Sequence, residues 1–275
     1  MTAIHVEPRP TTPSSVTRVL PFGSRHALHI IERNRLIFSR GWIVIVSGFF
    51  EPVFFLLGIG FGLGSLIGTV PGPNGVQIPY AVFVAPALLA TSAMNGAVYD
   101  TTNMFFRLRY EKAYDGMLAT PLNVGDIALG EVSWALGRGA LYGLGFLIVM
   151  FAFGLVPSPL GVLALPASML IGLATATAGL AATTFMRSWQ DLDLLFVVTL
   201  PLFLFSGTFF PVDTYPEPLR TLVELSPLYR GVDLVRGLTL GVVGITQLID
   251  VIYLSVWSVI FLMIASRRLG KMLIK

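Results

Sequence analysis

The sequence contains no cysteine and few charged residues. Of its 275 residues, 12% are Asp, Glu, Lys or Arg, against roughly a quarter in soluble globular domains. The absence of cysteine excludes disulfides, thiolate metal sites and cysteine nucleophiles within this chain. The shortage of charge, together with 55% hydrophobic residues and a mean hydropathy of +0.79, predicts a polytopic membrane protein.

Patterns typical of catalytic and nucleotide-binding sites are also missing. The three histidines, His5, His26 and His29, all precede the first apolar stretch, and no metal-ligand spacing occurs. There is no Gly-x-x-x-x-Gly-Lys-Ser/Thr phosphate loop, so we expect no ATP binding by that route. We therefore predict no catalytic residue, no metal and no cofactor on this chain, and place any ATPase domain on another protein.

Six apolar stretches are long enough, or nearly long enough, to span a bilayer. They cover residues 42–67, 80–106, 127–153, 160–185, 194–210 and 248–265. Such stretches must satisfy their backbone hydrogen bonds internally, and none shows the alternation of a barrel strand. We predict an all-α polytopic membrane protein whose six transmembrane helices form one domain at residues 41–268.

Lysine and arginine are distributed unequally between the two ends of these stretches. Most precede the first stretch or follow the second, fourth and sixth, whereas segments 69–79 and 154–159 have none. By the positive-inside rule both termini are predicted to be cytoplasmic, with a disordered tail at 1–24 and a second cytoplasmic tail at 269–275. Because the net charge of +3 comes from residues beside apolar stretches, we expect contact with membrane lipid and no nucleic acid.

Residues 25–40 have the periodicity of an amphipathic helix. Ile30 and Asn34 fall on one face, and the opposite face carries charge. The predicted interfacial residues are Glu32, Arg33 and Arg35. The helix is either a basic anchor that fixes orientation or a lever that joins the first span to a cytoplasmic partner.

The connection at residues 211–247 is divided by four prolines and is too polar for an ordinary span. Pro218 and Pro227 suit the first turns of two short helices. We predict outer re-entrant helices at 218–240, with a plain loop as the alternative.

Three ionisable residues, Glu51, Asp100 and Arg138, lie at predicted membrane depth. A charge at the bilayer centre costs about 2.5 to 3.5 kcal/mol and usually faces protein or water. Glu51 adjoins Pro52 and could line a substrate path, pair with Arg138 or only stabilise the bundle. Asp100 is close enough to the end of its span to reach the headgroups. These residues are weak candidates for a substrate path or, alternatively, for the ion relay of a secondary transporter or channel.

A charged segment at 107–121 separates the second and third apolar stretches. Its basic residues Arg107, Arg109 and Lys112 fit a solvated loop that obeys the positive-inside rule. Its second half has helical spacing, which places Tyr114, Met117 and Leu118 on one side.

We predict that this second half is a short surface helix presenting those apolar side chains and a carboxylate to a soluble partner. Pro121 would end the helix, and Asn123 or Asp126 would cap the next span.

Two motifs resemble the ABC-2 type export permeases, in particular their nodulation-factor (lipo-oligosaccharide) exporter branch. One is Tyr110-Glu-Lys-Ala-Tyr-Asp-Gly-Met-Leu-Ala-Thr-Pro-Leu122, followed by Asp126 to Gly130. The other is Pro201-Leu-Phe-Leu-Phe-Ser-Gly-Thr-Phe-Phe-Pro211 with Ser226-Pro-Leu-Tyr-Arg-Gly-Val-Asp-Leu-Val-Arg236. The six-span plan, the amphipathic helix and the paired outer helices agree with this resemblance over nearly the whole chain.

The resemblance implies a non-enzymatic permease subunit that pairs with a second permease copy, as a homodimer or a paralogous heterodimer. It also implies two copies of a separate ABC ATPase subunit, which bind ATP and Mg. The expected activity is export of a lipid-like, glycan-bearing or hydrophobic substrate across the plasma (inner) membrane.

The resemblance assigns segment 107–121 to ATPase coupling and residues in the second motif to an outer gate. The implied coupling residues are Arg107, Arg109, Tyr110, Glu111, Lys112, Tyr114, Asp115, Met117 and Leu118. The implied gate residues are Phe209, Phe210 and Tyr229.

Overall fold

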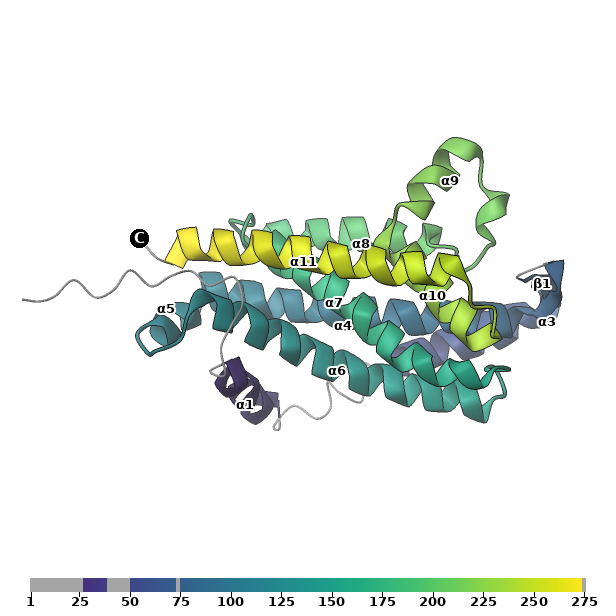
Figure 1. Ribbon diagram of the computed structural model, residues 1–275, viewed down its shortest axis with the longest axis horizontal. Coiled ribbons are helices and arrows are strands. Elements are labelled where there is room, and N and C mark those ends of the chain that lie inside the picture. The colour runs from purple at the N-terminus through teal and green to yellow at the C-terminus, as the bar shows by residue number, and fades with distance from the viewer. Residues whose placement is uncertain (1–26, 39–49, 73–74, 274–275) are drawn as a thin grey trace, which may run out of the picture.

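The computed structural model describes residues 27–38, 50–72 and 75–273 as a bundle of long helices (Figure 1). α5 (Ala113–Leu118) and the C-terminal end of α11 (Ile245–Leu273) lie at one end of the bundle, and β1 (Thr69–Pro71) lies at the other (Figure 1). Predicted tail 1–24 lies outside the described residues. Within the predicted tail at 269–275, α11 continues as far as Leu273, and the cytoplasmic location of this tail stays a prediction.

Five helices among the described residues are long and apolar enough to cross a membrane. They are Phe50–Ile67, α4 (Tyr80–Arg109), α6 (Val124–Ala152), Pro159–Thr183 and α11. The fourth consists of a 3-10 helix, η3 (Pro159–Leu163), continued by α7 (Ala164–Thr183). The chain is therefore an all-α polytopic membrane protein, and the predicted count of six spans is not confirmed.

The predicted span 194–210 is a shorter helix, α8 (Asp193–Phe205), which follows the 3-10 helix η4 (Trp189–Leu192). Its 13 residues extend about 20 Å at 1.5 Å per residue, less than the roughly 30 Å of bilayer hydrocarbon. α8 ends at a turn where Gly207 has a left-handed φ of 69°, a conformation that glycine adopts without strain. Apolar residues continue beyond this turn, so hydropathy alone overestimated the length of the helix.

The first predicted span is described only from Phe50, and its residues 42–49 lie outside the described part. From Phe50 the chain runs through the π-helix η1 (Leu56–Leu63) and the short helix α3 (Gly64–Ile67). An antiparallel hairpin of β1 and β2 (Gln77–Pro79) then leads into α4.

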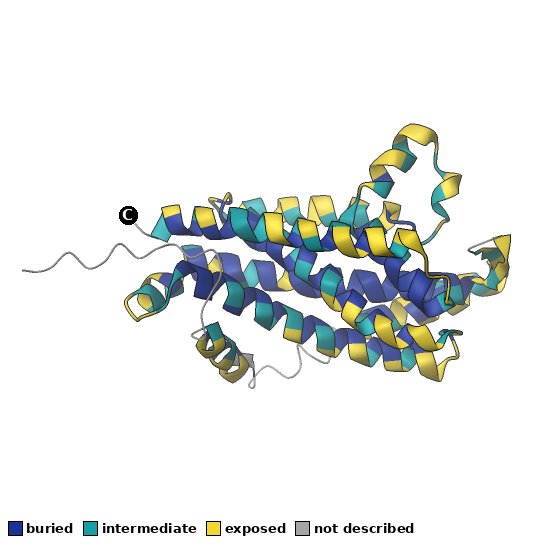
Figure 2. Ribbon diagram, viewed as in Figure 1, coloured by how far each residue is buried: buried dark blue, intermediate teal, exposed yellow. Residues whose placement is uncertain are grey.

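α4 is the central helix of the bundle and contacts α6, α7 and α10 (Pro227–Leu240). In its most apolar 18-residue window 89% of the residues are buried, against 17% in Phe50–Ile67 and 22% in α11. Figure 2 shows the buried residues in the interior of the bundle and the exposed ones along its outer faces. Small residues allow the close packing: a Cβ on Gly179 of α7 would lie 1.9 Å from Thr101 Oγ1 of α4.

The predicted amphipathic helix is α1 (Ala27–Phe38), which packs against α6. Ile30 and Asn34 are buried, and the Ile30 side chain fills the space above Gly130, where a Cβ would lie 2.7 Å away. Of the charged residues, Glu32 and Arg35 are exposed and Arg33 is half-buried. The described residues of the apolar face of α1 therefore pack against the protein interior.

The two helices predicted at 218–240 are α9 (Glu217–Glu224) and α10, separated from α8 by a 3-10 turn, η5 (Val212–Thr214). α9 stands away from the bundle (Figure 1). α10 packs inside it, with Gly231 against Ile171 of α7, and ends at left-handed Gly241. Both helices are confirmed as elements, while their insertion into a leaflet stays a prediction.

Candidate functional site

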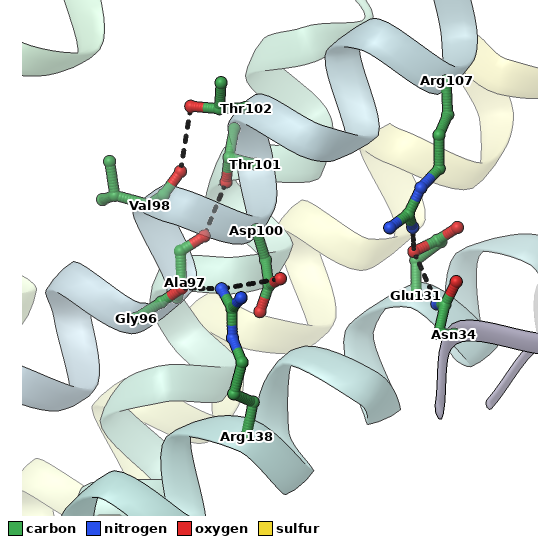
Figure 3. Close-up of polar contacts among 10 residues, drawn as sticks. All are labelled: Asn34, Gly96, Ala97, Val98, Asp100, Thr101, Thr102, Arg107, Glu131 and Arg138. Carbon is green, nitrogen blue, oxygen red and sulfur yellow. Dashed lines mark hydrogen bonds and ion pairs between the residues drawn. The ribbon is translucent and has the colours of Figure 1, made fainter. Parts of the chain in front are cut away.

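Two buried ion pairs join α4 to α6 (Figure 3). Asp100 Oδ1 lies 2.8 Å from Arg138 Nη2, and Arg107 Nη1 pairs with Glu131 Oε2. All four side chains are buried. Each helix carries a carboxylate and, seven residues later, a guanidinium. Because α4 and α6 are antiparallel, each cation meets the anion of the other helix.

The second ion pair extends into a cluster that involves four helices, which we call the joint cluster: Asn34, Arg107, Tyr114 and Glu131. Asn34 Nδ2 of α1 donates a hydrogen bond of 3.2 Å to the same Glu131 oxygen (Figure 3). Tyr114 of α5 is buried, and burial, followed by the negative charge of Glu131, raises the pKa of its hydroxyl well above its ordinary value. Tyr114 is therefore neutral at physiological pH, and the cluster connects α1, α4, α5 and α6.

The predicted coupling segment is partly turned inward. Arg107 was expected in a solvated loop, but it is buried in the last turns of α4 because Glu131 neutralises it. Arg109 is half-buried and donates to the Met186 carbonyl at 2.5 Å.

The apolar side of α5, which was expected to face a soluble partner, is also turned inward. Tyr114 is buried, and Met117 and Leu118 pack partly buried against the same core. The apolar side of α5 is turned toward protein because this helix lies against the core between α4 and α6. The predicted coupling residues that remain exposed are Tyr110, Glu111, Lys112 and Asp115.

The predicted cap of the third span is confirmed. Asn123 and Asp126 form a capping box at the first turn of α6. The Asn123 backbone N–H donates to Asp126 Oδ2 at 2.9 Å. This cap satisfies N–H groups that a helix leaves without intrahelical partners.

A cavity of about 600 Å³ lies between the Phe50–Ile67 helix, α4, α6 and α8. Glu51 and Arg138 both line it, and Glu51 accepts a hydrogen bond of 3.1 Å from Asn95 Nδ2. Of the predicted alternatives for Glu51, the structure places it in this lining, while Asp100 supplies the carboxylate beside Arg138. The expectation that Asp100 reaches the headgroups is wrong, because its side chain is buried in this ion pair.

The predicted gate residues surround the turn after α8. Tyr80 donates to the Phe209 carbonyl at 3.3 Å, the Tyr229 ring lies beside Gly207, and Phe210 is exposed. A gate function for these residues stays a prediction.

Arg236 of α10 is buried close to this turn. Its guanidinium lies 3.9 Å from the centroid of the Phe83 ring and donates to the Gly207 carbonyl at 2.8 Å. From the sequence, Arg236 was expected in the polar outer connection. It can be buried because a carbonyl group and an aromatic ring act as partners for its charge.

Glu131 and Asn34 were missed as site residues. The matched spacing of Asp100 with Arg107 and of Glu131 with Arg138 was the available signal, because antiparallel neighbours pair such charges. Within the described ranges, no three side chains of His, Asp and Glu gather closely enough to hold a metal ion.

Comparison with known proteins gives concordant matches. The profile of the ABC-2 type transporter family matches residues 26–240. Nodulation protein J of Rhizobium leguminosarum bv. trifolii is 34% identical over 261 residues, which cover 92% of this chain and 97% of that protein. Nodulation protein J of Rhizobium leguminosarum bv. viciae is 34% identical over 227 residues, 81% of this chain and 85% of that protein. Inner membrane transport permease YadH of Escherichia coli (strain K12) is 25% identical over 240 residues, 81% and 90% of the two chains.

Proposed function

The chain belongs to the ABC-2 type transporter family, and on that premise we propose that it is the permease subunit of an ATP-driven exporter in the inner membrane. ATP and Mg bind to a separate ABC ATPase, two copies of which attach to two permease copies. Both termini face the cytoplasm. The name of one relative, an inner membrane transport permease, supports transport across that membrane. We propose a lipid-like or glycan-bearing substrate because the sequence motifs resemble those of the nodulation-factor exporter branch.

The joint cluster is the observation that supports energy coupling through α5. Tyr114 anchors α5 to the core, Arg107 and Glu131 join α4 to α6, and Asn34 adds α1. A force on α5 therefore reaches three further helices through buried contacts. Such a connection suits a shift of the bundle between two states.

The exposed part of the coupling segment provides the contact with the ATPase. Glu111, Lys112 and Asp115 lie on the surface of the turn and of α5, at the bundle end that also carries the C-terminal end of α11 (Figure 1). Charged side chains of both signs can pair with complementary charges on a soluble partner and fix its orientation.

The cavity supports passage of the substrate beside α8. Its lining combines Glu51 and Arg138 with aromatic and aliphatic side chains. Secondary transport through Glu51, Asp100 and Arg138 is the alternative. It has weaker support, because Asp100 and Arg138 neutralise each other.

Vesicle transport by the reconstituted permease and ATPase tests this proposal. With ATP and no ion gradient, the wild type exports substrate. Asp115→Lys abolishes export and weakens ATPase association, because it reverses an exposed charge on α5. The matched control Glu217→Lys reverses an exposed charge on α9 and leaves export intact. Gradient-driven transport without ATP overturns the proposal in favour of a secondary transporter.

A further inference from the structure

Within the described part of the chain, the charges of Glu51, Asp100 and Arg138 at the cavity sum to one negative charge. Arg138 is offset by Asp100 at 2.8 Å, and its Nη2 also donates to the Gly96 carbonyl at 3.2 Å. Among the described residues, no cation lies within ion-pair distance of Glu51. Tyr99 and Tyr142 also line the cavity, and phenols ordinarily ionise only near pH 10. A negative site in a low-dielectric surrounding repels anions.

The polar lining also offers hydrogen-bond acceptors to a ligand. Asn95 donates to only one Glu51 oxygen, and a carboxylate has about four lone-pair sites. The hydroxyls of Thr91 and Thr199 donate to the carbonyls of Ala87 and Phe196, which leaves their lone pairs available to the cavity. A ligand whose head group donates hydrogen bonds therefore finds acceptors at Glu51, Thr91 and Thr199.

The remaining wall is apolar, and a large part of it lies on α8. Phe196 and Leu200 line the cavity and are 52% and 59% exposed, and α8 has no buried residue. This wall suits an alkyl or acyl chain, since burial of each CH₂ contributes about 0.8 kcal/mol.

We infer that the cavity binds amphiphiles whose head group donates hydrogen bonds and carries no negative charge, with Glu51 as the residue that excludes anions. The inference rests on the proposed export function and names its substrate class. Ammonium and hydroxyl-rich glycan head groups share this chemistry.

Binding to the purified permease in lipid nanodiscs tests the inference without ATP or ATPase. Three probes with the same tail, dodecylammonium, dodecyl maltoside and dodecyl sulfate, are compared below their micelle concentrations. In the wild type, at least one of the two probes without negative charge, dodecylammonium and dodecyl maltoside, binds at least about tenfold more tightly than dodecyl sulfate. This ratio corresponds to a difference in binding free energy of roughly 1.4 kcal/mol. The probe that binds identifies the head group as amine, glycan or both.

Glu51→Gln reduces this preference about tenfold, because it removes the repulsion of sulfate and weakens binding of the ammonium. Glu217→Gln removes a carboxylate on α9 and leaves the preference unchanged. Leu200→Trp fills the apolar wall at an exposed position and weakens every bound probe. Equal affinity for all three probes, no effect of Glu51→Gln, or binding of none of them overturns the inference.

The two proposals fail independently. If the permease shows the probe preference but vesicle transport does not depend on ATP, only the export proposal is overturned. ATP-driven export by a protein without the probe preference overturns only the substrate class.

Discussion

The two ion pairs between α4 and α6 have the same chemistry and similar burial but different neighbours. Arg138 of the first pair lines the cavity, whereas Glu131 of the second also binds Asn34 and lies near Tyr114. The first pair therefore sets the charge of a binding space, while the second connects helices. Two identical interactions in one helix pair can thus serve separate functions.

Neither pair needs to add net stability. Desolvation of two charges can cancel their attraction, so apolar residues can replace a buried pair with little loss of stability. What the pairs provide is register, because a shift of α4 along α6 separates both cations from their anions. The comparison can be tested by breaking each pair in turn.

The largest effect is expected from Glu131→Ala. It leaves Arg107 buried without its anion and removes the acceptor of Asn34, at a cost of about 3 to 5 kcal/mol. Denaturant unfolding in detergent micelles measures the loss. The double variant Arg107→Met with Glu131→Met recovers most of the stability, because no unpaired charge remains. A single-variant cost below about 1 kcal/mol contradicts the assignment of Glu131 as the centre of the cluster.

Asp100→Asn is expected to cost less, about 2 kcal/mol. Arg138 keeps its hydrogen bond to the Gly96 carbonyl in this variant, so its charge is not left without a partner. The same variant makes the cavity neutral overall and raises its affinity for dodecyl sulfate. Unfolding and probe binding together separate the two pairs, because Glu131→Ala lacks the second effect. An unfolding cost equal to that of Glu131→Ala removes the distinction between them.

The sequence predicted elements better than partnerships. Bounds for the second, third and fourth spans, and the two helices at 218–240, differ from the structure by a few residues, because apolar length and proline position are local signals. The fifth span was overestimated because its termination depends on the left-handed turn at Gly207 within an apolar run.

The candidate site was predicted only in part. Glu51, Asp100 and Arg138 were recognised because each is a single charge at membrane depth. Arg107 was placed in solvent because the positive-inside rule assigns a side of the membrane and says nothing of burial. Its partner Glu131 lies on another helix, so the pair becomes visible only when two helices are considered together.

Asn34→Ala tests the attachment of α1 to the joint cluster. Loss of one hydrogen bond to a carboxylate is expected to cost about 1 to 2 kcal/mol. Amide hydrogen exchange should rise in α1 and stay unchanged in α6, since the Arg107–Glu131 pair persists. Gln247→Ala is the matched control, because it removes an amide that hydrogen-bonds the carboxylate of Asp233 far along the chain from the cluster. Faster exchange throughout α6 contradicts the view that Asn34 holds only α1.

Asp115→Ala should have the smallest effect on stability, within about 0.5 kcal/mol, because the side chain is exposed. Its effect on ATP-driven transport should nevertheless be large, since α5 passes force to the joint cluster only when the ATPase holds it. Unfolding and vesicle transport on one preparation separate these quantities. Glu131→Ala loses both, whereas Asp115→Ala loses transport alone. If Asp115→Ala keeps full transport, the ATPase contact lies elsewhere on the exposed turn, and the joint cluster receives its force from another residue.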